Sequence, residues 1–449
     1  MAKEANSFLR VVGRAGIFPG MEPARTTLGS WDDARCSRRE ALKLGLCGLA
    51  GAAAGLLPGC GGDRPAAAGI TAGRELPDDA TWDLWLRRGW AREALHWEPG
   101  NAGAACCGLC PNGCVLEPGR RGPCRVRVNR GGTLFTLAYA NPCSLHADPV
   151  EKKPLFHFLP GSKSFSLATA GCIFHCLNCQ NWEISQRRPE ETKDATGPEL
   201  RLKAPLPASL SYADMARLSL FPEDVPAIAK SLGCASIACT YSDPVAFYEY
   251  TLGIARACRT AGVKTIMVTC GSIQGKPLRE LAPVLDAAHL DLKGFDEGTY
   301  RRLNSGRLQP VLDALVLLRQ AGVWVEVVNL VVPGWTDQRD GIRRMCAWLA
   351  EKVGPDTPLH FSRFMPAYQL TQVAPTPLET LLQARADARA AGLRYVYIGN
   401  VRDVPDAATT VCPACHKPVV QRDLFAVTKL DVAAGRCRHC GAVLAGVWS

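Results

Sequence analysis

From residue 164 onward, short apolar runs alternate with longer segments whose apolar positions recur at helical spacing. The short runs predict strands at 164–170, 234–240, 264–270, 287–293, 323–332, 357–363 and 393–398. The longer segments predict helices near 223–232, 244–261, 277–285, 309–321, 339–352 and 377–391. This repeated order predicts an α/β fold with a parallel sheet and right-handed crossovers.

Two stretches depart from this repeat. Residues 190–222 are rich in Pro and Leu and interrupt it as a long insertion or lid. Near the amino terminus, residues 81–97 carry large apolar side chains at roughly helical spacing, which predicts a helix packed in a core. These side chains are Trp82, Trp85, Leu86, Trp90 and Leu95.

Residues 1–60 have the layout of an export signal. Ser37-Arg38-Arg39 precedes an apolar, small-residue stretch at 44–57, as in twin-arginine signals. An ordinary helix is the alternative, although a segment so rich in Gly and Ala would pack poorly. Residues 61–80 read as a Gly/Ala/Pro linker. The signal favours export or membrane attachment. After residue 60 no run of about 18 strongly apolar residues follows, so no membrane-spanning helix is predicted there.

The chain has 449 residues, 47% of them apolar, which fits one large domain with small appendages. The formal net charge of +10 permits an acidic or nucleic-acid partner without requiring one. The 21 cysteines change the picture more, because many of them gather in three tight clusters. In so large a chain this pattern favours metal sites over a disulfide framework.

Cys172, Cys176 and Cys179, spaced C-x3-C-x2-C, follow the predicted strand at 164–170. Three thiolates at this spacing can reach three corners of one iron–sulfur cube. The fourth iron would keep open coordination, which a cluster needs if it is to bind a substrate. The alternative is a tetrahedral zinc site completed by His175 or by a distant cysteine.

The other two clusters supply four cysteines each. The first contains Cys107, Cys110, Cys114 and Cys124. For this cluster, structural zinc, an auxiliary iron–sulfur cluster and plain buried cysteines all stay open. The second contains Cys412, Cys415, Cys437 and Cys440. Its two C-x2-C pairs predict a zinc ribbon or rubredoxin-like module, with zinc or iron as the tetrahedral metal.

The C-x3-C-x2-C motif resembles the signature of radical S-adenosylmethionine (radical SAM) enzymes. Its flanks, EKKPLFHF at 151–158 and QNWEIS at 180–185, resemble the AmmeMemoRadiSam system radical SAM proteins, relatives of the pyruvate formate-lyase activating enzymes. The resemblance implies a partial (β/α) barrel of radical SAM type over residues 151–405. A Cys-rich module at 81–150 would precede this barrel, and a zinc-ribbon module at 406–449 would follow it.

The resemblance also implies where SAM binds, because chemistry in such barrels gathers at the carboxyl ends of the strands. The implied contacts are Thr240, Tyr241, Asp243, Thr269, Asp291, Lys293, Asn329 and Val331. Asp243 would accept from the amino group of SAM, where relatives carry the longer Glu. Asn178, Cys270 and Met365 also depart from the residues usual in the family. No protein general base is implied.

Two functions are compared. As an enzyme, the chain would use a [4Fe-4S] cluster to cleave SAM to a 5′-deoxyadenosyl radical, which abstracts hydrogen from a target. The family implies a protein target, Memo-type and AMMECR-type partners, and a flavodoxin or ferredoxin as reductant. The alternative is a non-catalytic metal-binding scaffold or nucleic-acid-binding protein. All three ligand cysteines are present, which favours the enzyme. The SAM chemistry of such an enzyme favours a cytoplasmic location over export.

Overall fold

The computed structural model describes residues 76–207, 209–402 and 404–449, which all belong to one compact unit. The predicted signal at 1–60 and most of the predicted linker at 61–80 lie outside the described residues. The linker prediction is wrong at its end, because helix α1 (Asp79–Arg87) begins there, capped by Asp78. In the part of the chain that the structure describes, no helix is long and apolar enough to cross a membrane.

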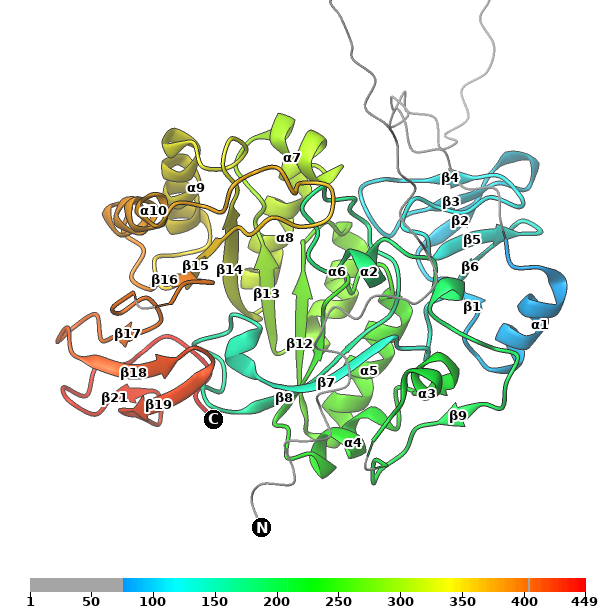
Figure 1. Ribbon diagram of the computed structural model, residues 1–449, viewed down its shortest axis with the longest axis horizontal. Coiled ribbons are helices and arrows are strands. Elements are labelled where there is room, and N and C mark those ends of the chain that lie inside the picture. Colours follow the sequence, from blue (N-terminus) through cyan, green and yellow to red (C-terminus); the bar gives the residue numbers. More distant parts are fainter. Residues whose placement is uncertain (1–75, 208, 403) are drawn as a thin grey trace, which may run out of the picture. The chain divides into compact units, whose positions relative to one another are not determined.

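An eight-stranded sheet forms the centre of the fold (Figure 1). In spatial order its strands are β16 (Val396–Gly399), β15 (Leu359–Arg363), β14 (Trp324–Val331), β13 (Ala287–Asp291), β12 (Lys264–Thr269), β11 (Ser236–Cys239), β8 (Lys163–Ala168) and β7 (Ser144–Pro149). Every neighbouring pair from β16 to β8 is parallel, which confirms the predicted strand–helix repeat. β7 was not predicted, and it pairs antiparallel with β8 at the edge.

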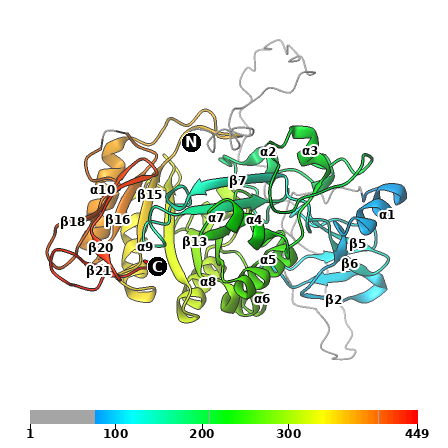
Figure 2. The same ribbon diagram turned by 90° about the horizontal axis from the view of Figure 1, so that it is seen from below.

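Helices that follow the strands pack on one face of this sheet (Figure 2). They are α4 (Val225–Ser231), α5 (Tyr248–Ala261), α6 (Gly275–Leu281), α7 (Glu297–Asn304), α8 (Leu308–Gln320), α9 (Arg339–Lys352) and α10 (Leu378–Ala390). Alternate strand positions, such as Ile237, Met267 and Val327, join these helices in the main apolar core, because successive side chains point to opposite faces. All six predicted helices are present, and α7 is an addition.

The opposite face of the sheet carries many polar side chains. Asp148 of β7, His289 of β13 and Glu326 of β14 alternate with the core positions of their strands. One end of this face is closed by the segment at 150–159, whose apolar side chains pack on Ala238, with Ile266 and Ala287 beside it. The polar face therefore opens toward the carboxyl ends of the strands.

Residues 76–143, here called the N-terminal segment, form two small sheets. One contains β1 (Arg92–Glu93), β6 (Thr133–Thr136) and β5 (Arg127–Arg130), and the other contains β2 (Trp97–Pro99), β3 (Ala105–Cys107) and β4 (Val115–Leu116). The predicted helix at 81–97 is wrong beyond Arg87, where Gly89 turns the chain with a φ of +67°. Trp82, Trp85 and Trp90 are still buried together, so the predicted core packing is confirmed for the tryptophans.

Residues 406–449, here called the C-terminal segment, contain a three-stranded sheet and a short hairpin. The sheet has β17 (Thr410–Val411), β18 (Pro418–Asp423) and β19 (Ala426–Leu430), and the hairpin has β20 (Val432–Ala433) and β21 (Arg436–Cys437). Arg422 attaches this segment to the central sheet, since its guanidinium donates to the Phe156 carbonyl at 2.6 Å. Arg422 also lies 3.7 Å from the carboxylate of Glu151, and both side chains are fully buried.

The remaining elements are short. They are α2 (Trp182–Ser185), β9 (Leu200–Arg201), α3 (Tyr212–Arg217), β10 (Leu218–Ser219) and four single 3-10 turns, η1 (Asn101–Gly103), η2 (Val150–Lys152), η3 (Pro189–Glu191) and η4 (Ala282–Val284). β9 and β10 pair in parallel within the predicted insertion at 190–222. Lys193 anchors this insertion, because its buried ammonium donates to the Pro142 and Met215 carbonyls at 2.6 and 2.7 Å.

Candidate active site

The loop after β8 carries the three cysteines of the C-x3-C-x2-C motif. Gly171 begins this loop with a φ of +94°, and a Cβ there would lie 2.7 Å from the carbonyl oxygen of Cys124. Glycine is therefore required both for the turn and for the close approach of the N-terminal segment. The loop is held from another side by α7, because the Leu177 N–H donates to the Leu303 carbonyl at 2.9 Å.

Each of the three sulfurs has a hydrogen-bond partner. The Phe174 N–H lies 3.4 Å from Cys172 Sγ, Asn304 Nδ2 lies 3.2 Å from Cys176 Sγ, and Ser185 Oγ lies 3.1 Å from Cys179 Sγ. Hydrogen bonds to sulfur are a usual feature of iron–sulfur sites. Burial raises the pKa of Cys176 to about 11, so a bound cation is needed to keep this thiolate charged at neutral pH.

The motif allows two metal sites, a [4Fe-4S] cluster with each thiolate on a different iron and a tetrahedral zinc site. The hydrogen bonds to all three sulfurs favour the cluster, because such bonds are usual at iron–sulfur sites.

Asp243 follows β11 and is buried beside this loop. Its carboxylate accepts from the Val245 N–H at 2.9 Å, the Cys270 N–H at 2.8 Å and the Thr269 hydroxyl at 3.1 Å. Burial, and next the charge of Asp243, raise the pKa of Cys172, which places the carboxylate close to this thiol. Helix α5 begins further along the chain with a different residue in its cap position, so Asp243 is not its N-cap.

Asp291 and Lys293 form an ion pair at the end of β13. Lys293 Nζ lies 2.9 Å from a carboxylate oxygen of Asp291, and the Lys293 N–H donates to the Tyr300 hydroxyl at 2.9 Å. Burial raises the pKa of Cys176, and the charge of Lys293 partly offsets this increase. The pair therefore supplies a cation next to the cysteine loop.

A further polar cluster lies on the same face. Of its residues, only Tyr241 was predicted to belong to the site. The carboxylate of Asp148 accepts from the Tyr241 hydroxyl at 2.6 Å and from Lys153 Nζ at 3.0 Å. Burial lowers the pKa of Lys153 to about 8. Tyr241 holds a left-handed φ of +65°, which is unusual for a side chain of its size and is common at functional sites. The charges of the EKKPLFHF stretch were the sequence signal for Lys153.

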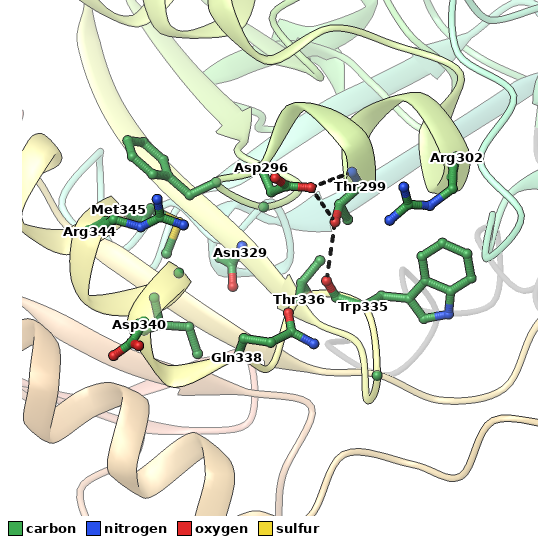
Figure 3. Close-up of a pocket in the computed structure, with 15 residues that line it drawn as sticks. Asp296, Thr299, Arg302, Asn329, Trp335, Thr336, Gln338, Asp340, Arg344 and Met345 are labelled. Atoms are coloured by element: carbon green, nitrogen blue, oxygen red, sulfur yellow. Dashed lines mark hydrogen bonds between the residues drawn. The ribbon is translucent and has the colours of Figure 1, made fainter.

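Two predicted SAM contacts lie near the carboxyl end of β14, on the helix-covered face of the sheet. Strand alternation turns Val331 into the core on the helix-covered face of the sheet, and Asn329 lies on that face too. Asn329 lines a cavity of about 340 Å³ between α7 and α9, where Figure 3 shows it near Thr336 and Asp296. Its Oδ1 is buried and has no hydrogen-bond partner. The other six predicted contacts lie at or next to the carboxyl ends of β11, β12 and β13.

The four cysteines of the C-terminal segment lie close together. The sulfurs of Cys412, Cys415, Cys437 and Cys440 all lie within 4.8 Å of one another, and two pairs are 3.7 and 3.8 Å apart. These separations match four thiolates around one tetrahedral metal. Zinc and iron both suit such a site.

Comparison with known proteins now identifies the family. Residues 166–346 match the model described as the radical SAM superfamily. Over 352 residues the chain is 39% identical to the uncharacterized protein MJ0808 of Methanocaldococcus jannaschii, an alignment that spans 78% of this chain and 98% of that protein. The chain belongs to the radical SAM superfamily. Within it, this radical SAM protein and MJ0808 are members of one family.

The radical SAM protein is also similar to other proteins over shorter stretches. It is 25% identical to the benzylsuccinate synthase activating enzyme of Thauera aromatica over 173 residues, which is 35% of this chain and 52% of that enzyme. A solved domain of pyruvate-formate lyase-activating enzyme from Bacteroides vulgatus aligns with 37% of this chain and 99% of that domain, at 16% identity and a TM-score of 0.32. Streptococcus suis SuiB bound to S-adenosylmethionine aligns with 56% of this chain and 53% of its own, at 13% identity and a TM-score of 0.39.

Proposed function

We propose that this radical SAM protein cleaves SAM reductively and abstracts hydrogen from a protein substrate, as an enzyme of the activating type. The main support is that three hydrogen-bonded thiols and the carboxylate of Asp243 meet at the carboxyl ends of the strands. When bound at these thiols, a [4Fe-4S] cluster supplies the electron that cleaves SAM to methionine and a 5′-deoxyadenosyl radical.

The roles of the side chains follow from their contacts. Cys172, Cys176 and Cys179 would hold the cluster through three of its irons, and SAM would bind at the iron without a protein ligand. An ionised carboxylate has about four acceptor positions. Those on Asp243 accept from the N–H groups of Val245 and Cys270 and from the hydroxyl of Thr269, which hold the carboxylate where the ammonium group of SAM would approach it.

The ion pairs on the polar face orient the rest of the ligand. Lys293 lies next to the cysteine loop and is suited to bind the carboxylate of SAM, while Asp291 can accept from a ribose hydroxyl. Tyr241 and Lys153 share the carboxylate of Asp148 further along the face, where hydrogen abstraction from the substrate would take place. Thr240 lies buried directly after the end of β11.

Membership of the AmmeMemoRadiSam group, with Memo-type and AMMECR-type partners and a flavodoxin or ferredoxin as reductant, is the finer part of the proposal. It rests on the EKKPLFHF and QNWEIS stretches that flank the cysteines. Similarity to the benzylsuccinate synthase activating enzyme supports a protein substrate. For the four cysteines of the C-terminal segment we propose zinc, because their sulfur separations suit one tetrahedral metal.

Anaerobic reconstitution with iron, sulfide, a reductant and SAM tests the proposal. The full chain should release 5′-deoxyadenosine, and Cys176→Ala should abolish this release together with the spectral change that SAM causes in the cluster. Cys346→Ala is the matched control, because this cysteine lies on the buried face of α9, away from the motif, and should leave SAM cleavage unchanged. Full SAM cleavage by the Cys176→Ala protein would exclude the proposed function.

A further inference from the structure

The cavity between α7 and α9 is separate from the cysteine loop. Its volume of about 340 Å³ is in the range of small-molecule sites. Gly294 and Phe295 after β13, Asn329 of β14 and the first turn of α9 all line it, and none of the cysteines that the structure describes does. The cavity lies on the helix-covered face of the sheet, whereas the polar face carries the proposed SAM site.

Asn329 presents an unused acceptor to this cavity. Its side chain is 1% exposed, and its Nδ2 donates to the Leu292 carbonyl at 2.7 Å. Its Oδ1 is buried and has no hydrogen-bond partner. Figure 3 shows this oxygen directed into the space between the lining side chains. Because an unpaired buried acceptor is costly, the floor of the cavity suits a ligand group that donates an O–H or N–H.

The neighbouring hydroxyl groups do not supply this donor. The hydroxyl of Thr336 donates to the Leu330 carbonyl at 3.0 Å, and that of Thr299 donates to Asp296 Oδ1 at 3.0 Å. Both hydroxyl protons are therefore used within the protein. A donor for Asn329 Oδ1 has to come from a bound molecule.

The first turn of α9 supplies donors at the other side of the cavity. Gln338, Asp340 and Gly341 line the cavity here. The first amide N–H groups of a helix have no intrahelical partner and carry partial positive charge. Gln338, in the cap position, makes no side-chain hydrogen bond to them. Such a turn is suited to an anionic group.

Two arginines flank the same cavity. Figure 3 shows Arg302 of α7 and Arg344 of α9 on opposite sides of it, and both are exposed. Hydrogen bonds from Thr299 lower the pKa of Asp296, and the charges of both arginines lower it further. The carboxylates of Asp296 and Asp340 balance the two guanidinium charges. An anion would therefore be held by direct contact with the α9 amides and a guanidinium, rather than by a large positive field.

We propose that this cavity binds a small hydroxylated anion, a compound of a few carbons with a hydroxyl at one end and a phosphate or carboxylate at the other. The hydroxyl would donate to Asn329 Oδ1. The anionic group would lie at the first turn of α9 and accept from its amides and from Arg344. None of these contacts involves the cluster or SAM, so this inference does not rest on the proposed function.

Binding of simple probes to the reconstituted full chain tests the inference. Glycerol 3-phosphate and glycerate each carry a hydroxyl and an anionic group, whereas glycerol lacks the anion and inorganic phosphate lacks the hydroxylated carbon chain. In anaerobic calorimetric titrations, at least one of the first two should bind with a dissociation constant below about 1 mM. It should bind at least about tenfold more tightly than glycerol or inorganic phosphate. Whichever compound binds decides between phosphate and carboxylate.

Variants locate the bound compound. Asn329→Leu removes the acceptor, and Arg344→Gln removes one cation, so each should weaken binding by about tenfold or more. Arg343→Gln is the matched control, because this neighbouring exposed arginine is not among the lining residues. Gly341→Leu replaces Asn329→Leu if that variant does not fold. A Cβ at Gly341 would have no heavy atom within 4 Å, so the fold can accept a side chain there that narrows the cavity.

No binding of either compound at about 10 mM would overturn the inference. Equal binding of inorganic phosphate would mean an adventitious ion only and would also overturn it. The same holds if Asn329→Leu or Arg344→Gln leaves the affinity unchanged, or if Arg343→Gln weakens it as much as Arg344→Gln. An excess of SAM should not displace the bound compound, and displacement would show that the compound occupies the SAM site instead of this cavity.

Discussion

Asp243 is held by the ends of two neighbouring strands before any ligand binds. Its carboxylate joins the end of β11 to Thr269 and Cys270 at the end of β12. Burial raises its pKa, while the hydrogen bonds from Cys270, Val245 and Thr269 act in the opposite direction. The Asp243 side chain is therefore fixed by its neighbours rather than free to turn.

Asp243→Asn should weaken SAM binding by about one to two decades, because a charge-assisted hydrogen bond contributes roughly 1.5–3 kcal/mol. Iron content should stay unchanged, since Asp243 is not a ligand. Titration of SAM into the reconstituted proteins measures the effect, with Thr269→Ser as a control that keeps the hydroxyl donor. Equal dissociation constants for the wild type and the Asn variant would remove Asp243 from the site.

His157 makes the attachment of the C-terminal segment dependent on pH. Its Nδ1 lies 2.7 Å from the Ala445 carbonyl and its Nε2 lies 2.6 Å from the Tyr397 hydroxyl, so a neutral ring with a proton on Nδ1 satisfies both partners. Burial lowers the pKa of His157 to about 4. If the C-terminal segment separates from His157, the ring becomes exposed and binds a proton near pH 6.5. Lowering the pH from about 6.5 to 4 therefore favours this separation.

Hydrogen exchange of the C-terminal segment should therefore accelerate as the pH is lowered from 6.5 to 4, after correction for the intrinsic exchange rate. His157→Gln cannot titrate in this range and should lose most of this extra pH dependence, although its exchange will be faster at neutral pH. The variant also serves as a control for acid effects on the cysteines. If the exchange rates of both proteins change equally with pH, His157 does not control the docking of the C-terminal segment.

At the scale of the elements, the sequence pattern predicted the strands and helices whose apolar positions are periodic or continuous. Every parallel strand of the central sheet and six helices were readable because each has an apolar face or run. β7 was missed because His146 and Asp148 interrupt its apolar positions, and α7 because its first turn and last turn are charged. The helix predicted at 81–97 was too long because Trp90 is buried from a bend that follows the helix rather than from the helix itself.

The apolar core of the C-terminal segment is small, so we expect the segment to depend on the metal proposed for its four cysteines. Cys440→Ala should release about one equivalent of metal and unfold this segment locally, because structural metal contributes folding energy directly. Iron bound at Cys172, Cys176 and Cys179 should remain. Metal analysis together with limited proteolysis checks both expectations, and Val443→Ala at an exposed position serves as the control. Full metal retention by Cys440→Ala would exclude a four-thiolate site.

At the scale of the whole molecule, the cysteine sets were readable from spacing, but the contacts between distant segments were not. Arg127 and Glu249 are 122 positions apart, and Glu151 and Arg422 are farther still. No local pattern marks such pairs, because each charged residue looks solvated until the fold buries it. The sequence also did not show which face of the sheet carries Asn329 and Val331, because this depends on a strand register that composition does not reveal.

The Arg127–Glu249 pair joins β5 of the N-terminal segment to α5, and its side chains are 2% and 1% exposed. Removing one member of a buried pair leaves an uncompensated charge, so Glu249→Gln should cost about 3–5 kcal/mol in unfolding free energy. The double variant Arg127→Met, Glu249→Met leaves no buried charge and should be more stable than either single variant. Urea unfolding followed by tryptophan fluorescence measures these differences, since Trp82, Trp85 and Trp90 form a cluster in the N-terminal segment. Additive losses in the double variant would show that the two charges contribute independently, and that the pair does not hold the segment to α5.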